Sequence, residues 1–138
     1  MASYVPTRLV PLDGDRALLY IAGQVAIRDG KLMTGRVPEE VSIEQAQEAA
    51  RVCALNILAQ IESAAGLERV EQIAQLIGWV LSSDGFAQHP EVINAASDLI
   101  GQVLGESGKH TRAAVGANAL PRNVTVEIAA TVVVRTDS

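Results

Sequence analysis

The chain has 138 residues, of which 49% are hydrophobic and 3% aromatic, and its formal net charge is −5. This length allows one domain with a substantial core but not two, so we expect residues 1–138 to form a single domain. An acidic chain is poorly suited to non-specific nucleic-acid binding, which needs a basic surface. We therefore expect no nucleic-acid partner. No run of 18 apolar residues is present, so we expect no membrane partner either.

The cysteine content points to a reducing compartment. Cys53 is the only cysteine, which excludes an internal disulfide. The N-terminal sequence also lacks the continuous apolar segment of a signal peptide. We therefore expect a cytoplasmic protein. Cys53 lies on an apolar helical stripe without a neighbouring base, which favours an inert buried thiol over a nucleophile.

The first third of the chain is rich in turn signals. Residues 1–15 contain two prolines and an Asp-Gly pair, and we expect them to be irregular. Ala17–Val25 has the composition of a strand. Asp29-Gly30 stands between two short extended pieces and predicts a β-hairpin.

Two helices are expected in the middle of the chain. Ser42 and Gln45 have the spacing of a capping box, and apolar residues at helical spacing follow until Gly66. Pro90 suits the first turn of a second helix, which the glycines at 105 and 108 should end. Between the helices, Val70–Leu81 fits a mostly buried strand.

The last two strands are expected at Arg112–Ala119 and Val124–Val134, joined at Leu120-Pro121. The order of elements predicts an α+β fold in which one mixed β-sheet carries two helices on one face. On the other face the last strand presents Thr, Ala and Val side chains together with Glu127. That mildly apolar face favours burial against other subunits.

Arg112 and Glu127 are the candidate functional residues. A guanidinium at the start of an alternating apolar run is poorly placed for packing, but it can hold a carboxylate in a two-pronged hydrogen bond. Pro121 follows nine residues after Arg112, and Glu127 follows six after that proline. The plainer alternatives are a sheet-edge arginine in a surface ion pair and a solvated strand glutamate.

Four segments of the chain resemble the RidA/YjgF family, the reactive-intermediate deaminases with a chorismate-mutase-like fold. They are YIAGQ (20–24), AARVCALNILAQI (49–61), VINAAS (92–97) and HTRAAVGANALPRNVTVEI (110–128). The last segment is the most specific, because its arginine, its Leu-Pro pair and its Val-Glu-Ile keep the family's spacing. NAASDL (94–99) and GKHTRAAVG (108–116) resemble one branch of this family. The resemblance covers about Tyr4 to Val134.

The resemblance implies a homotrimer of the bacillary chorismate-mutase type, with a barrel-like centre and three clefts between neighbouring subunits. It implies that Arg112 grips a substrate carboxylate, and that Glu127 and backbone groups near Gly23 position water or the imine nitrogen. Asn94 also matches a family site residue, and Tyr4 is a candidate for the family's N-terminal pocket tyrosine. The match of Tyr4 requires about five extra residues near 11–15. The family's frequent cysteine two positions after the arginine is Ala114 here.

The function expected from this resemblance is hydrolysis of 2-imino or 2-enamino acids to 2-keto acids and ammonia, without a metal or organic cofactor. A non-catalytic trimer that binds a small carboxylate would use the same arginine, so no residue separates these two hypotheses. A chorismate-mutase-type reaction would need several cations, and only Arg112 is clearly placed. Ribonuclease activity is disfavoured by the net acidity. His89 and His110 lack partners at metal-ligand spacing and are expected to be ordinary loop and strand-entry residues.

Overall fold

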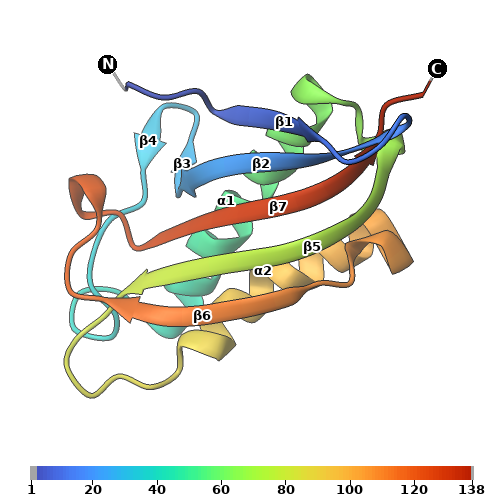
Figure 1. The fold of residues 1–138 in the computed structure, drawn as a ribbon. Helices are drawn as coiled ribbons and strands as arrows, with labels where there is room; N and C mark the ends of the chain where they lie inside the picture. Colours follow the sequence, from blue (N-terminus) through green and yellow to red (C-terminus); the bar gives the residue numbers. More distant parts are fainter. Residues whose placement is uncertain (1–2, 138) are drawn as a thin grey trace.

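The computed structural model describes residues 3–137, and its strands form one five-stranded mixed sheet with the order β1-β2-β7-β5-β6. These strands are β1 (Thr7–Pro11), β2 (Arg16–Val25), β7 (Val126–Arg135), β5 (Val70–Leu81) and β6 (Thr111–Ala117). Neighbouring strands are antiparallel except for β5 and β6, which are parallel. The two helices, α1 (Ile43–Ala64) and α2 (His89–Leu104), both lie behind the sheet in Figure 1 and cover one face. The predicted α+β architecture is confirmed.

Local signals in the sequence determine both helices. Ser42 accepts a hydrogen bond from the Gln45 amide and the Gln45 side chain accepts one from the Ser42 amide, so the predicted capping box is formed at the start of α1. Pro90 lies in the first turn of α2. The short 3-10 helix η2 (Gly105–Gly108) follows α2 directly, and η1 (Leu67–Arg69) follows α1. The predicted hairpin is also present, as the pair β3 (Ile27–Arg28) and β4 (Lys31–Leu32) around Asp29-Gly30.

One prediction about the first 15 residues is wrong. Thr7–Pro11 is the edge strand β1, and it pairs with β2 in the register Thr7↔Ile21 to Pro11↔Ala17. The prolines were turn signals, but a proline at the end of an edge strand removes no ladder hydrogen bond that the sheet requires. The residues at 12–15 form the turn between β1 and β2.

The last two strands also differ slightly from prediction. β6 ends at Ala117 rather than Ala119, and β7 begins at Val126 rather than Val124. Val124 instead forms an isolated bridge with Thr34. The 3-10 helix η3 (Pro121–Asn123) connects the two strands.

The core lies between the sheet and the two helices. Alternate residues of β7 from Val126 to Val134 are fully or almost fully buried there, as the alternating pattern predicted. Gly78 of β5 permits close packing of α2, because a Cβ at this position would lie 2.6 Å from Ile93. The opposite face of the sheet is uncovered in the chain (Figure 1). On this face Val10, Tyr20 and Val115 are 40%, 46% and 43% exposed. Large apolar side chains gathered on a solvent-facing surface are typical of an interaction site.

None of the helices among residues 3–137 has both the length and the apolar character that a membrane span requires.

Candidate functional site

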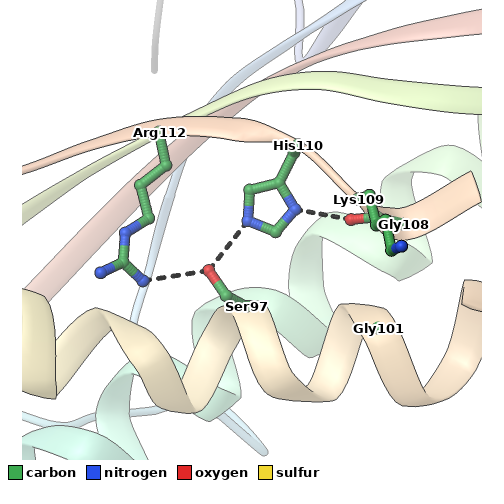
Figure 2. A pocket seen from close by; sticks show the side chains of 6 residues that line it. All are labelled: Ser97, Gly101, Gly108, Lys109, His110 and Arg112. Carbon is green, nitrogen blue, oxygen red and sulfur yellow. Dashed lines mark hydrogen bonds between the residues drawn. The ribbon is translucent and has the colours of Figure 1, made fainter. Parts of the chain in front are cut away.

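Arg112 lies near the beginning of the edge strand β6, on the face of the sheet that carries the helices. Its register partner on β5 is the fully buried Leu76, which fixes this orientation. Figure 2 shows the side chain extending from β6 toward α2. Its Nη1 donates to Ser97 Oγ at 3.2 Å and its Nη2 to the Pro90 carbonyl oxygen at 3.3 Å. The guanidinium is therefore held against α2 by two neutral acceptors.

The charge of Arg112 has no carboxylate partner among residues 3–137, since none of their ion pairs includes it. A guanidinium carries five N–H donors, and two are engaged here. Three donors remain, which is enough for a two-pronged grip on one carboxylate. The plainer hypothesis of an arginine in a surface ion pair is thus not supported.

Arg112 lines a surface cavity of about 580 Å³. The other lining residues are Ser97 and Gly101 of α2, Gly108 of η2, and the connecting residues Lys109 and His110 (Figure 2). Lys109 is exposed and pairs with Glu106 at 3.2 Å. The cavity is thus bordered by cationic and hydrogen-bonding groups and opens beside the outer edge of β6.

Asn94 lies on the same side of α2 as this cavity. It is one helical turn from both Pro90 and Ser97, the two residues that bind Arg112, and residues at this spacing share a helix face. Its side chain is exposed. The structure therefore brings two of the candidate residues, Arg112 and Asn94, to one edge of the molecule.

Glu127 and Gly23 form a second group, on the uncovered face of the sheet. Glu127 of β7 is paired with Val25 of β2 and Trp79 of β5, and its side chain is half-buried. Gly23 lies at a β-bulge in β2, between Ile21 and Gln24. A Cβ at Gly23 would lie 2.0 Å from Glu127 Oε2, so only a glycine leaves room for this carboxylate.

Burial alters the chemistry of Glu127. Desolvation raises the pKa of this carboxyl above its ordinary value, and the described residues supply no ion pair that would offset the effect. A carboxyl with a raised pKa is better suited to exchange a proton near neutral pH than a solvated one. Burial also raises the pKa of the Cys53 thiol, which is fully buried, so this cysteine has the inert character predicted for it.

Tyr4 belongs to the segment that precedes β1. Two residues later, the Pro6 carbonyl oxygen accepts a hydrogen bond from the Ala22 amide at 2.9 Å, so this segment passes the bulge at Gly23. The Tyr4 side chain is 69% exposed. The structure thus brings the Tyr4 segment to the same bulge as Gly23, and it leaves the ring itself without a covering group.

Two groups therefore exist, and the sheet separates them. Arg112 lies on the helix-covered face, whereas Glu127 lies on the uncovered face, as their partners Leu76 and Trp79 on β5 show. Within one copy of the chain, the two side chains therefore start from opposite faces of the sheet. Sequence reasoning did not reveal this separation, because it depends on the register between strands.

Sequence reasoning also missed Ser97 and His110, which contact each other beside Arg112. The one local signal was the spacing of His110 and Arg112, because residues two apart on a strand share a face. Ser97 gave no signal, since its position beside Arg112 requires the packing of β6 against α2. His110 directly precedes β6, as predicted, and His89 is the first residue of α2 rather than the last of a loop.

The family model described as "YjgF/chorismate mutase-like, putative endoribonuclease" matches residues 4–131. The chain belongs to this family. Protein TCP17 of Trypanosoma cruzi is 41% identical to the chain over 117 residues, which cover 83% of the chain and 73% of that protein. The identified family agrees with the resemblance inferred from the motifs around Arg112 and Glu127.

Two solved structures have folds similar to that of the chain. The crystal structure of Atu1372 from Agrobacterium tumefaciens has a TM-score of 0.88 and 44% identity, covering 97% of the chain and 85% of that protein. The structure of E. coli TdcF with bound serine has a TM-score of 0.62 and 26% identity, covering 96% of the chain and 89% of that protein. The α+β fold observed here is the fold of this family.

Proposed function

We propose that the protein hydrolyses 2-imino and 2-enamino acids to 2-keto acids and ammonia, in a carboxylate-binding cleft between the subunits of a homotrimer. The observation that carries this proposal is the half-buried guanidinium of Arg112, which has three free donors and no carboxylate partner among residues 3–137. A small metabolite with one carboxylate fits this requirement.

The separation of the two groups supports an intersubunit site. Arg112 borders an edge strand, whereas Glu127 and Gly23 lie on the uncovered sheet face. A neighbouring copy whose edge approaches that face would bring its Arg112 to Glu127 of the first copy. The same packing would cover the exposed Val10, Tyr20 and Val115, whose burial is favourable at about 25 cal/mol per Å² of apolar surface.

The chemistry requires modest assistance, because such imines already hydrolyse in water. Arg112 would anchor the carboxylate of the substrate. Glu127 would orient a water molecule and accept a proton from it as its oxygen bonds to the imine carbon. Both protons of this water pass to the nitrogen, one of them by way of Glu127, so the nitrogen leaves as ammonia and the C=N bond is replaced by a C=O bond. The reaction as written needs no metal or organic cofactor.

A binding protein without turnover is the second candidate function. The observation that favours it is the structure of E. coli TdcF, a protein of 26% identity, with serine bound. Serine carries the carboxylate that Arg112 is suited to hold. In this alternative the same cleft would sense or sequester a small carboxylate.

A turnover assay separates the two candidates. An amino-acid oxidase generates the imino acid in situ, and the rate of keto-acid release is followed with and without the protein. Release faster than in buffer supports the enzyme, whereas buffer-level release together with calorimetric binding of a 2-keto acid supports the binding protein.

A parallel incubation with single-stranded RNA tests the ribonuclease activity in the family description, which the net charge of −5 disfavours.

A further inference from the structure

A chain of three hydrogen bonds ends at Arg112 (Figure 2). Arg112 Nη1 lies 3.2 Å from Ser97 Oγ, Ser97 Oγ lies 2.8 Å from His110 Nε2, and His110 Nδ1 lies 2.6 Å from the Gly108 carbonyl oxygen. The groups come from four places in the fold: strand β6, helix α2, the 3-10 helix η2, and the link between η2 and β6. These hydrogen bonds thus connect the guanidinium to three separate backbone segments.

When the His110 ring is neutral, the chemistry of the two ends determines the direction of every bond. A carbonyl oxygen only accepts, so His110 Nδ1 carries the proton and donates to Gly108. In the neutral ring Nε2 is then an acceptor, and the Ser97 hydroxyl donates to it. The lone pairs of Ser97 Oγ remain available to accept from Arg112, which can only donate. Each donor in this series of hydrogen bonds therefore has an acceptor, and no two donors face each other.

The arrangement also limits what Ser97 can do. A serine inside a helix commonly turns its hydroxyl back to a carbonyl of the preceding turn. Here the 2.8 Å contact with His110 draws the hydroxyl toward β6, where its oxygen meets the guanidinium. Ser97 fixes Nη1 and the Pro90 carbonyl fixes Nη2, so these two contacts and the covalent attachment at Nε together define the plane of the guanidinium.

We propose that Ser97 and His110 are positioning residues, which hold the Arg112 guanidinium in the orientation that grips a substrate carboxylate. The inference rests on the function proposed above, because it assigns a role to residues that contact Arg112 rather than the substrate. His110 sets the direction of the Ser97 hydroxyl, and Ser97 sets the plane of the guanidinium. The two residues pre-organise the anchor before the ligand arrives.

Substitutions of Ser97 test the first step. Ser97→Ala removes the acceptor of Arg112 Nη1, and we expect the Kd for a 2-keto acid and the KM for the imino acid to rise about threefold to tenfold with kcat nearly unchanged, as for the loss of one pre-organising hydrogen bond. Ser97→Thr keeps a hydroxyl and should retain most of the affinity. Ser63→Ala, an exposed serine of α1, is the control for the gain in helix propensity.

Substitutions of His110 test the second step. His110→Gln places an amide oxygen near the position of Nε2 and can still accept from the Ser97 hydroxyl. His110→Asn can imitate only the Nδ1 donor, so it loses that acceptor. We expect His110→Asn to weaken binding as Ser97→Ala does, and His110→Gln to weaken it less. In the double variant of Ser97→Ala and His110→Asn the losses should not add, because both act through one hydrogen-bond chain.

The outcomes separate this inference from the proposed function. If the wild-type protein binds 2-keto acids and Ser97→Ala or His110→Asn leaves Kd and KM unchanged, the positioning role is overturned and the proposed function stands. If the wild-type protein neither binds nor turns over any 2-keto or 2-imino acid, both are overturned. Equal losses for Ser97→Ala, Ser97→Thr and Ser63→Ala, with a lowered Tm, would also overturn the positioning role, since they indicate general destabilisation.

Discussion

Substitution of Gly23 by alanine tests whether the position of the Glu127 carboxylate matters for turnover. The added Cβ would lie 2.0 Å from Glu127 Oε2 and 2.9 Å from its Cδ, and real Cβ contacts essentially never fall below 3.0 Å. The carboxylate must therefore move by about 1 Å, and a misplacement of about this size in a catalytic constellation can lower turnover by about 10²-fold. Keto-acid release from an imino acid generated in situ measures the effect.

The stability of the Gly23→Ala variant should change little. The obstructing atoms belong to the end of a flexible side chain, and Gly23 does not have a left-handed backbone conformation. We expect the free energy of unfolding to stay within about 1 kcal/mol of the wild-type value, by urea denaturation. Gly14→Ala is the matched control, because a Cβ at Gly14 has no atom within 4 Å, and it should leave both turnover and stability unchanged.

A double variant shows whether Gly23→Ala acts through Glu127. If it does, Gly23→Ala should add almost nothing to the loss caused by Glu127→Gln, because the displaced group is already inactive. Full turnover by Gly23→Ala would refute the role of the Glu127 position. Losses that simply add would show that Gly23 acts separately, for example as a backbone contact of the substrate.

Three further predictions concern the two charged residues and the assembly. Arg112→Lys keeps the charge but not the planar fork, so the affinity for a 2-keto acid should fall by about 1.5–3 kcal/mol, or about 10- to 150-fold, in calorimetry; an unchanged Kd would remove Arg112 from the site. Glu127→Gln should lower turnover by about 10²–10⁴-fold with similar ligand affinity. Light scattering at micromolar concentration should give the mass of a trimer, whereas 14.5 kDa would contradict it.

The elements that the sequence predicted well are those with local signals. The Ser42–Gln45 capping box, the Asp29-Gly30 turn and the alternation of β7 each involve residues close together in the chain. Strand β1 was not predicted, because its stability comes from pairing with β2 across a turn. The prolines in this part of the sequence indicated irregular structure instead. Tertiary pairing overrode local propensity there.

The candidate residues could be chosen from the sequence, but their arrangement in space could not. The spacing of Arg112, Pro121 and Glu127 could be compared with a family motif. Their placement on opposite faces of the sheet could not be read from that spacing, because it depends on the pairing of β5 with both β6 and β7. The contact of Ser97 with Arg112 likewise arises only when the parallel crossover from β5 to β6 packs α2 beneath the edge strand.

The most direct test of the central claim is a complementation experiment with subunits that carry Arg112→Lys or Glu127→Gln. Each homotrimer alone should have little turnover. When the two are unfolded together and refolded at equal concentration, random assembly puts one intact cleft in every mixed trimer, and about a quarter of the wild-type turnover should return. This result is predicted if each cleft takes Arg112 from one subunit and Glu127 from the next. No recovery, in mixed trimers verified by mass spectrometry, would contradict the account.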